Sequence, residues 1–485
     1  MNYRAVLRYL GQVLAIEALF MVPALLFSLY YGEPQAIRAF GLTIVLTFGV
    51  GFLLSRLKLR DSIYAREGFV IVALSWMAMS FFGALPFWFS GAIPRFVDCW
   101  FETVSGFTTT GSTILTEIEG MDNGLLYWRS FTHWLGGMGV LVFLLAIVPL
   151  ARGNGDALHL LRAESPGPAP GKMTPTIRQT SRALYGIYVV LTVVEIVLLL
   201  LGGMPAFDAV NNALATAGTG GFAIKNASIA AYPSPYIHLV IGVFMALFGV
   251  NFNLYYLLLL RNFRSVWKDE ELRLYLGLML GATVFIGLDI LPGYQGQGAG
   301  KAFLDSFFQV SSVMTTTGFA TADFNLWPQF SRLVLVLLMF FGASAGSTGG
   351  GIKISRLLIL GKLMMREMRN MLRPRGVHVA RMNGKSLEED TIRGTAAFLV
   401  AYCGICGLSM LLISLENFSL ETTVTSVIAC INNIGPGLDM VGPMGNFSQF
   451  SAFSKIVLSL DMLFGRLEIF PMLLLFYPKI WKKRV

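Results

Sequence analysis

Apolar runs separated by short polar segments determine how this chain is organised. Most of the runs are long enough for a helix of roughly 20 residues, the length that crosses the hydrocarbon core of a bilayer. The pattern therefore predicts an all-α integral membrane protein with ten membrane-spanning helices. We expect these spans at residues 9–30, 38–55, 69–90, 126–150, 181–203, 236–260, 272–291, 330–361, 395–415 and 453–480.

Four further segments, between the predicted spans, are too short to cross a bilayer and too apolar for ordinary loops. In three of them an aspartate lies thirteen positions before a glycine: DCWFETVSGFTTTG (98–111), DAVNNALATAGTGG (208–221) and DSFFQVSSVMTTTG (305–318). A single TTTG run fits a turn between helices, but the shared spacing argues against that alternative. We interpret each segment as a short re-entrant helix followed by extended backbone, which membrane proteins tolerate where it is buried by protein or lines a water-filled cavity.

The three aspartates suggest how the short helices begin. Asp98, Asp208 and Asp305 are good N-cap residues, because a carboxylate accepts hydrogen bonds from free backbone N–H groups and suits the positive end of the helix dipole. We therefore expect these three residues to cap the short helices. The glycine and threonine residues at the other end allow backbone conformations that other residues resist.

The fourth segment, ETTVTSVIACINNIGPGL at 421–438, has an ambiguous register. If Gly435 is aligned with the other glycines, Thr422 takes the place of the aspartate. If Gly437 is aligned instead, the pattern of a glycine followed by an apolar residue is preserved. The pattern does not separate the two alignments, and we place the fourth contribution within residues 433–437.

Each short segment lies between two spans, so the chain contains four units of span, short helix, extended segment and span. Four extended segments can form rings of carbonyl oxygens that replace the hydration shell of an ion, and the C-terminal ends of the short helices also favour a cation. We expect a pseudo-fourfold arrangement preceded by a helix pair. The expected divisions are residues 1–66, 67–178, 179–268, 269–392 and 393–485.

The charge distribution supports this topology. Charged residues are 13% of the chain, whereas soluble proteins carry about a quarter. Lys and Arg gather in the same alternate loops and in the tail KIWKKRV, which predicts cytoplasmic N- and C-termini. The basic start followed by a long apolar stretch also predicts a retained first helix rather than a cleaved signal. Topology accounts for the net charge of +9, so we expect no nucleic-acid partner.

Enzyme signatures are absent from the sequence, so we do not expect an enzyme. The four histidines are dispersed, and neither an HExxH motif nor a triad pattern occurs. Cys403 and Cys406 form a CxxC pair inside an apolar stretch, without nearby His or further Cys. We interpret this pair as core residues rather than as a metal or redox site.

The stretch GASAGSTGGGIK at 342–353 lies within the eighth predicted span. Each glycine costs a helix interior about 1 kcal/mol relative to alanine, and five glycines occur between residues 342 and 351, so the helix should break. A break at mid-membrane is a candidate gate, and close helix packing through small residues is the alternative. The candidate gate residues are Gly342, Ser344, Gly346, Ser347, Thr348, Gly349, Gly350 and Gly351. No other span is clearly broken in the pattern, whereas a carrier with alternating access favours broken helices in paired halves.

Several charged residues fall inside predicted spans, where charge is costly. One interpretation of Arg466 is an ion pair with Asp461 or Glu468. The alternative is a place near the candidate gate, where Arg466 forms an electrostatic barrier to cations or donates hydrogen bonds to loop carbonyls. We interpret Glu17 and Glu195 as acids that face other helices rather than as proton-coupling sites. The basic stretch 362–393 is expected to be a solvated cytoplasmic loop, with docking to an acidic regulatory ring as the sharper hypothesis.

In these features the chain resembles the Trk, Ktr and HKT superfamily of cation uptake proteins, most closely the bacterial Trk type (TrkH and TrkG). The resemblance covers the whole chain, including the extra N-terminal helix pair. The matching motifs are TTTGST (108–113), GTGGF (218–222), TTTGF (315–319), NNIGPGL (432–438), GASAGSTGGGIK (342–353) and FGRLEIFP (464–471).

The resemblance implies potassium uptake across the bacterial inner membrane by a homodimer that a cytosolic nucleotide-binding ring of the TrkA type gates. It also implies that Arg466 lies near the gate loop. In related plant proteins a serine at the position of Gly111 accompanies sodium preference, so Gly111 favours K⁺ over Na⁺, with Rb⁺ as another candidate ion. Proton- or sodium-coupled symport and a poorly selective channel remain as alternatives. The implied K⁺-binding filter residues are Thr109, Thr110, Gly111, Thr219, Gly220, Gly221, Thr316, Thr317, Gly318, Asn433, Ile434 and Gly435, with Gly437 as the alternative.

Overall fold

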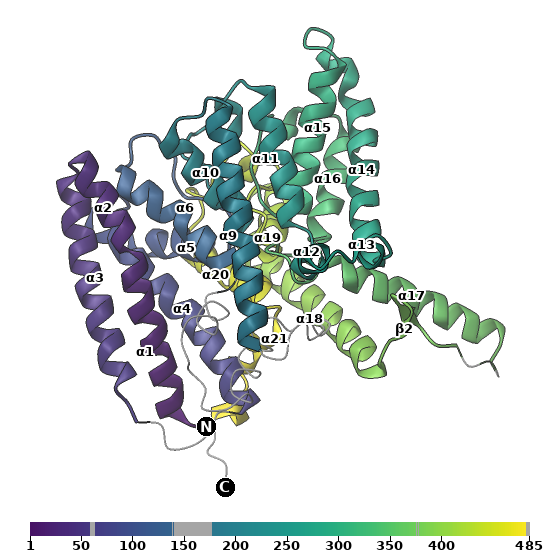
Figure 1. Ribbon diagram of the computed structural model, residues 1–485, viewed down its shortest axis with the longest axis horizontal. Helices are drawn as coiled ribbons and strands as arrows, with labels where there is room; N and C mark the ends of the chain where they lie inside the picture. Colours follow the sequence, from purple (N-terminus) through teal and green to yellow (C-terminus); the bar gives the residue numbers. More distant parts are fainter. Residues whose placement is uncertain (59–63, 138, 140–176, 375, 377, 482–485) are drawn as a thin grey trace.

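The computed structural model describes residues 1–58, 64–137, 139, 177–374, 376 and 378–481, and this part of the chain is almost entirely helical (Figure 1). Its only strands are β1 (Arg381–Met382) and β2 (Lys385–Ser386), which pair antiparallel. The expected all-α membrane architecture is confirmed.

The chain begins with a helical hairpin. α1 (Tyr3–Phe20) and α2 (Val22–Tyr31) follow one another, and α3 (Pro34–Ser55) runs back beside them (Figure 1). The turn is tight because Gly32 adopts a left-handed φ of 72° and Pro34 begins α3 in a conformation suited to a first helical turn. α1 and α3 pack closely through Gly11 and Gly51, since a Cβ atom on Gly51 would lie 2.6 Å from the Ala15 nitrogen.

Each of the four units that follow contains a long helix, a short helix, an extended segment and another helix. The long helices are α4 (Ala65–Phe89), α9 (Ile177–Leu201), α14 (Glu270–Ile290) and α18 (Glu389–Ile413). The short helices are α5 (Phe96–Phe107), α10 (Ala206–Gly218), α15 (Ala299–Met314) and α19 (Leu420–Ile431). The last helices are α6 (Asn123–Gly137), α11 (Pro235–Phe248), α16 (Gln329–Phe340) and α20 (Ala452–Arg466). The N-terminal hairpin and these units agree with the predicted arrangement.

Six helices of the described residues are long and apolar enough to cross a membrane: Tyr3–Tyr31, Pro34–Ser55, Arg66–Phe89, Ser181–Leu201, Glu270–Tyr294 and Glu389–Glu416. A seventh span is bent, because α11 and α12 (Phe252–Leu259) meet at 92°. The predicted span 126–150 is represented by α6, which ends at Gly137, and residues 138 and 140–150 lie outside the described part.

More predicted spans are broken than the glycine pattern indicated. The predicted span 330–361 divides into α16 and α17 (Ile354–Leu372), and 453–480 divides into α20 and α21 (Phe470–Leu475). With the bend between α11 and α12, three spans are interrupted, so the expectation of a single break was wrong. The other two breaks carry few glycines; the one after α20 places Glu468 and Ile469 at φ of 54° and 69°.

The four units share their apolar cores with their neighbours. One cluster joins the N-terminal hairpin and the first unit to the fourth unit, through residues such as Trp128 and Val427. Another joins the third unit to the fourth, and a third cluster brings Phe308 and Phe319 of the third unit against the second. A small cluster containing Ile118 and Ile224 joins the first unit to the second. The units therefore surround a common centre, with contacts between successive neighbours.

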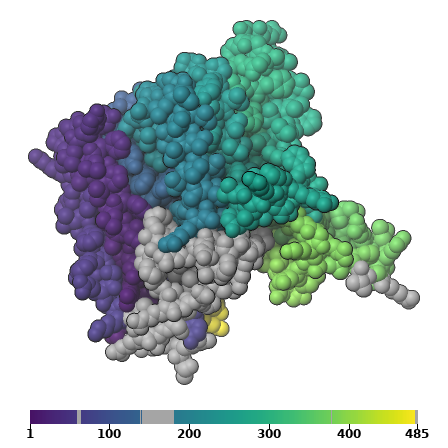
Figure 2. Space-filling model, in the orientation of Figure 1, coloured from purple at the N-terminus to yellow at the C-terminus, as the bar shows by residue number. Residues whose placement is uncertain are grey.

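The basic stretch after the eighth predicted span is structured rather than a loop. α17 projects from the body, and the β1–β2 hairpin follows it (Figures 1 and 2). Lys362 pairs with Glu270, and Asn383 in the hairpin turn donates to Asp269 Oδ2 at 2.8 Å. Most described residues of this stretch are exposed, as expected, but the expectation of a loop was wrong, because α17, the hairpin and the start of α18 give the stretch regular structure.

Two minor predictions about buried residues have different outcomes. Glu17 and Glu195 are buried, and Glu17 faces α4, since a Cβ atom on Gly83 would lie 3.1 Å from its Oε1 atom. These acids therefore face other helices, as expected. Cys406 is also buried, but Cys403 is exposed on α18, so the interpretation of both cysteines as core residues was wrong for Cys403.

Candidate ion pathway

The backbone after each short helix repeats one conformation four times. The first residue of the pattern has a left-handed φ without being glycine: Thr109 (55°), Thr219 (54°), Thr316 (59°) and Asn433 (55°). Two positions later comes a glycine with positive φ: Gly111 (86°), Gly221 (75°), Gly318 (89°) and Gly435 (97°). Such conformations cost non-glycine residues of order 1–3 kcal/mol each and gather at functional sites. The repeat resolves the fourth register in favour of Gly435.

Gly437 lies outside this pattern. Its backbone N–H donates to the carbonyl of Val441 at 2.7 Å, and a Cβ atom there would meet the Thr425 hydroxyl at 2.7 Å rather than another extended segment. The alternative alignment on Gly437 is therefore wrong. That alignment was suggested by a glycine followed by an apolar residue, but Gly437 and Leu438 belong to the loop that follows the repeated conformation.

The four patterned glycines pack against one another's segments in cyclic order. A Cβ atom on Gly111 would overlap the carbonyl oxygen of Gly220, one on Gly221 would overlap that of Thr317, and one on Gly318 would overlap that of Ile434. A Cβ atom on Gly435 would lie 2.8 Å from the carbonyl oxygen of Thr110, which closes the ring. Only glycine permits this approach, so the four segments form one closed arrangement.

The carbonyls in this ring belong to the middle residue of each extended segment, namely Thr110, Gly220, Thr317 and Ile434. The side chains of the threonine, asparagine and isoleucine residues in the four extended segments are buried, and the threonine hydroxyls bond within the protein. Thr110 lies 2.8 Å from the Thr108 hydroxyl, Thr317 lies 2.7 Å from the Thr315 hydroxyl, and Asn433 donates to Thr110 at 2.9 Å. Backbone oxygens therefore remain as the groups able to replace a cation's hydration shell.

The short helices do not begin at the expected aspartates. The N-cap positions are Arg95, Pro205 and Gly298, so Asp98 and Asp208 lie in the first turn of their helices and Asp305 lies well inside α15. The capping prediction was wrong because these carboxylates bind other side chains. Asp98 pairs with Lys455 at 2.7 Å, and Tyr232 donates to Asp208 at 2.6 Å. Lys301, Tyr294 and Thr321 donate to Asp305 at 2.7, 3.1 and 3.0 Å.

The fourth short helix does have a side-chain cap. Ser419 accepts from the Thr422 backbone N–H at 3.1 Å, and both hydroxyls donate to Asp439 in the following loop. These two hydroxyl donors hold the pKa of Asp439 below its usual range. An acid thus lies beside the start of this helix too, although it comes from the loop rather than from position 422.

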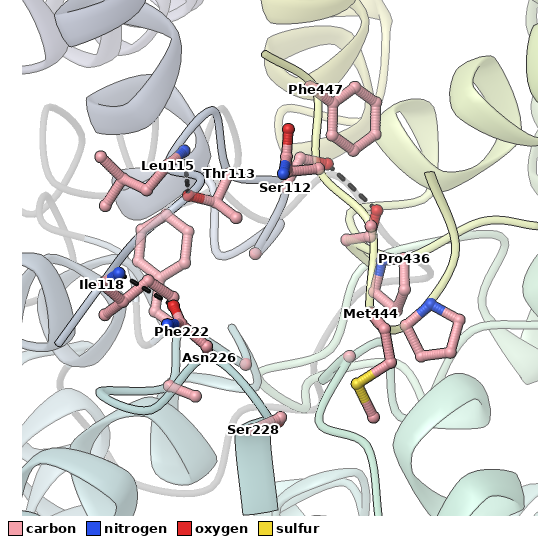
Figure 3. Close-up of a pocket in the computed structure, with 18 of the residues that line it drawn as sticks. Ser112, Thr113, Leu115, Ile118, Phe222, Asn226, Ser228, Pro436, Met444 and Phe447 are labelled. Carbon is pink, nitrogen blue, oxygen red and sulfur yellow. Dashed lines mark hydrogen bonds between the residues drawn. The ribbon is translucent and has the colours of Figure 1, made fainter. Parts of the chain in front are cut away.

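A cavity of about 120 Å³ opens on one side of the glycine ring (Figure 3). Its walls come from the chain segments that follow the extended segments, and it touches all four patterned glycines. Ser112 donates to the Gly435 carbonyl at 3.2 Å, and Asn226 accepts from the Ile118 N–H at 2.9 Å, so neighbouring units are bonded at its rim. The cavity therefore opens onto the ring from this side.

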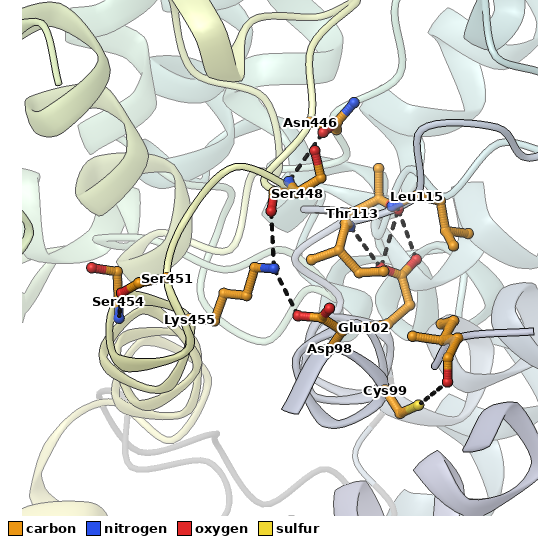
Figure 4. A network of polar contacts seen from close by, with 12 residues as sticks. Asp98, Cys99, Glu102, Thr113, Leu115, Asn446, Ser448, Ser451, Ser454 and Lys455 are labelled. Atoms are coloured by element: carbon orange, nitrogen blue, oxygen red, sulfur yellow. Dashed lines mark hydrogen bonds and ion pairs between the residues drawn. The ribbon is translucent and has the colours of Figure 1, made fainter. Parts of the chain in front are cut away.

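A buried ion pair supports the same rim. Arg129 of α6 pairs with Glu102 of α5 at 2.6 Å, and both side chains are almost fully buried. Glu102 also accepts from the Thr113 hydroxyl at 2.9 Å and the Ile114 N–H at 3.0 Å (Figure 4). Arg129 donates to the Ala223 carbonyl at 2.8 Å. The pair therefore connects the segments after the first and second short helices.

On the opposite side of the ring lies a loop at residues 341–353 between α16 and α17, which contains the predicted gate residues and which we call the gate loop after that prediction. The Gly350 N–H donates to the Thr316 hydroxyl at 2.6 Å. A Cβ atom on Gly350 would lie 2.6 Å from the Asn432 carbonyl oxygen, and one on Gly349 would lie 2.9 Å from the Thr315 carbonyl oxygen. The glycines thus let the loop lie directly against the ends of the third and fourth short helices.

The remaining gate-loop residues bond within the loop or to residues at the break between α11 and α12. The Gly342 N–H donates to Ile352 at 2.9 Å, the Ser344 N–H to Gly249 at 3.0 Å, and the Ser347 hydroxyl to Ser344 at 2.6 Å. Gly346 accepts from the Phe252 N–H at 3.0 Å, the Thr348 hydroxyl donates to Phe248 at 3.2 Å, and Gly351 has a φ of 68°. The break between α11 and α12 supplies several of these partners, so the two broken spans meet here.

Glu271 connects the gate loop to the start of α17. One carboxylate oxygen accepts from the Ala345 N–H at 2.7 Å and from the Ser355 N–H at 3.0 Å. Glu271 is buried at the start of α14. It was not among the residues expected at the site, because an acid at the edge of a span looks like an ordinary interfacial residue.

Arg466 connects the gate loop to the first unit. Its guanidinium donates to the Thr348 carbonyl at 2.8 Å, to the Thr109 hydroxyl at 3.2 Å, and to the carbonyls of Gly136 and Gly137, the latter at 2.7 Å. The acids suggested as its partners have other bonds: Glu468 pairs with Arg356, and Asp461 accepts from Ser409 at 2.7 Å. Arg466 therefore lies beside both the gate loop and the first extended segment.

Glu102, Arg129 and Glu271 were missed by pattern analysis. Glu102 and Arg129 lie in moderately polar segments, where a single charge attracts no notice until its partner is known. The available signal was the cost of charge at membrane depth, which was applied to Arg466 but not to these residues.

The helical fold, the closed ring of backbone carbonyls and the loop against it define a multi-pass membrane transport protein rather than an enzyme. The chain belongs to the TrkH family, described as cation transport proteins, whose profile matches residues 34–483. The predicted resemblance to the Trk, Ktr and HKT superfamily is thereby confirmed.

The relatives extend over the full chain. The Trk system potassium uptake protein TrkH of Salmonella typhimurium is 36% identical over 488 residues, with 100% of both chains covered. The Trk system potassium uptake protein TrkG of Escherichia coli K12 is 32% identical, with 99% of both chains covered. The crystal structure of the potassium transporter TrkH from Vibrio parahaemolyticus superimposes with a TM-score of 0.87 at 31% identity, covering 99% of this chain and 100% of that one.

Proposed function

We propose that this chain takes up potassium through a pore on the axis of the four extended segments. The observation that carries the proposal is the cyclic contact of four glycines with the carbonyls of Thr110, Gly220, Thr317 and Ile434. Four backbone oxygens around one axis provide neutral ligands that compensate a dehydrated monovalent cation. The C-terminal ends of four short helices add partial negative charge near the same point.

Gly111 is the residue that favours K⁺ over Na⁺ in this proposal. Because a Cβ atom there would overlap the Gly220 carbonyl oxygen, a serine would displace the second segment and deform the ring. A deformed ring no longer holds four oxygens at the spacing that suits the larger ion. The potassium names of the full-length relatives agree with this assignment.

The gate loop and Arg466 form the gate of the proposed pore. The loop lies on the axis side of the third and fourth short helices, opposite the open cavity, so a cation leaving the ring meets it directly. In this proposal the loop's hydrogen bonds to the break between α11 and α12 and to Glu271 of α14 keep the path closed. Movement of these anchors would open the path.

Further parts of the proposal concern the assembly. The N-terminus and the start of α9 lie toward one end of the molecule (Figure 1), where Tyr3 also donates to the Trp481 carbonyl at 2.6 Å. We assign this end to the cytoplasm of a bacterial inner membrane. The projecting α17 and its hairpin lie at the lower end of α14, where a cytosolic nucleotide-binding ring of the TrkA type would have access. We also propose a homodimer, with Rb⁺ and weakly Na⁺ as alternative ions.

Coupled symport with protons or sodium is the second candidate, favoured by the three broken spans. The breaks occur in equivalent final helices of the second, third and fourth units and lie next to the proposed pore. Alternating-access carriers instead break corresponding helices in two halves around a midplane site. The position of the breaks therefore favours a gated pore.

Flux through the purified protein in liposomes tests the proposed function. A K⁺ gradient should drive K⁺ and Rb⁺ flux well above Na⁺ flux, and the K⁺ flux should persist when a proton uncoupler collapses the pH gradient. Equal K⁺ and Na⁺ flux would refute the selective filter, and abolition of K⁺ flux by the uncoupler would favour coupled symport.

A further inference from the structure

The second extended segment differs from the other three at its middle position. Thr110, Thr317 and Ile434 carry side chains behind the carbonyl that joins the ring, whereas Gly220 carries none. Its φ does not lie in the left-handed region that favours glycine. Backbone conformation therefore does not explain this glycine, and its surroundings must.

His133 of α6 occupies the place of the missing side chain. A Cβ atom on Gly220 would overlap the Nδ1, Cε1 and Cγ atoms of the His133 imidazole. The ring also packs against Phe222, with centroids 4.2 Å apart and planes at 56°. His133 is fully buried, so its imidazole fills the space directly behind the second carbonyl of the ring.

The backbone of α6 follows the same segment for one further turn. A Cβ atom on Gly218 would overlap the His133 carbonyl oxygen, and one on Gly137 would lie 2.7 Å from the Gly218 Cα atom. Three glycines thus let a helix of the first unit press against the extended segment of the second. Position 133 is the point where this helix places a side chain behind the ring.

The chemistry of the imidazole indicates more than space filling. Neither ring nitrogen has a hydrogen-bond partner among the described residues. A buried polar group without a partner costs about 1–3 kcal/mol, a cost that an apolar side chain in the same place would not carry. A histidine at position 133 therefore costs more stability than an apolar residue that would fill the same space. This cost points to a role of the imidazole at the neighbouring carbonyl ring.

We propose that His133 is a positioning residue of the ion pathway: its ring replaces the side chain absent at Gly220 and holds the second carbonyl in place. The inference rests on the proposed filter, because it assigns the His133 contact to ion selection. Without the imidazole the second segment relaxes outward, and the ring loses the spacing that discriminates K⁺ from Na⁺.

A double-substitution experiment tests the assignment in liposomes, with K⁺ and Na⁺ flux as readouts. His133→Ala should lower the K⁺/Na⁺ flux ratio at least about threefold while K⁺ still passes. Gly220→Ala should lower K⁺ flux at least about tenfold, because its methyl group overlaps the imidazole. Combining the two should restore K⁺ flux at least about tenfold above Gly220→Ala, since the alanine methyl then has room.

His238 provides the matched control. It is a second buried histidine whose ring nitrogens lack partners among the described residues, but it packs in α11 against Phe308 with centroids 6.0 Å apart. His238→Ala should leave the K⁺/Na⁺ ratio unchanged. If both histidine substitutions change the ratio equally, the effect is general loss of packing and the assignment fails.

Two further outcomes decide the assignment even where a variant is unstable. The same four-variant cycle is measured as thermal stability in detergent, and additive losses for His133→Ala and Gly220→Ala would overturn the proposed contact. A K⁺-selective wild type with an unchanged ratio in His133→Ala would refute the positioning role alone. A wild type that does not select K⁺ would instead refute the proposed filter.

Discussion

Replacing Arg466 distinguishes two ways in which it can keep the proposed pathway closed: as a latch that bonds the gate loop, or as an electrostatic barrier to cations. Its bond to the Thr348 carbonyl at 2.8 Å is the contact that reaches the gate loop, while its other described bonds reach the first unit. A hydrogen bond from a charged donor contributes about 1.5–3 kcal/mol. Since each 1.4 kcal/mol is a factor of ten, Arg466→Ala should shift the open-to-closed ratio about 10- to 150-fold.

The measured quantity is K⁺ flux in liposomes at equal protein content, and it should rise until opening no longer limits the flux. Arg466→Lys is the control, because lysine keeps the charge but loses the planar fork that reaches several carbonyls at once. If the residue acts as a latch, the lysine variant also conducts more. If it acts as an electrostatic barrier, the lysine variant stays near wild type. Unchanged or lower flux in Arg466→Ala, with normal expression and a monodisperse protein, would refute both.

Three further predictions concern the ring and its supports. Gly111→Ser should lower the K⁺/Na⁺ flux ratio because its side chain overlaps the Gly220 carbonyl, and an unaltered ratio would count against the first extended segment as filter. Arg129→Met should lower the free energy of unfolding by about 3–5 kcal/mol, because it leaves Glu102 buried without its cation. Adding Glu102→Gln should recover part of this loss in a thermal unfolding measurement. Glu271→Gln should raise K⁺ flux about tenfold, because the neutral amide is the weaker acceptor for the N–H groups of Ala345 in the gate loop and Ser355 in α17. Reduced flux would show that this carboxylate is needed for conduction rather than closure.

Periodicity and spacing predicted the helical membrane fold, the four units and three of the four extended segments. These features depend on local sequence, because an apolar run of spanning length or a glycine at a sharp turn can be recognised without knowing which residues it contacts. The gate loop was predicted for the same reason, since five glycines in ten positions break a helix in any context.

Most of the failed predictions concern residues whose position is decided by the side chains or segments they pack against. Asp98, Asp208 and Asp305 have the chemistry of N-caps, but lysine and tyrosine side chains bind them instead. The register at Gly435 required the neighbouring Thr110 carbonyl, and the break after α11 required the gate loop against which it packs. His133 looked like a dispersed histidine until the missing side chain at Gly220 was located beside it.

The central claim is that the carbonyls of Thr110, Gly220, Thr317 and Ile434 hold the transported cation. The most direct measurement is an experimental structure of the protein equilibrated with Rb⁺, whose anomalous scattering locates the ion. The account predicts a Rb⁺ peak on the axis within this carbonyl ring, reduced when excess K⁺ is present. Rb⁺ bound elsewhere in the molecule with none in the ring, at concentrations that support flux, would contradict it.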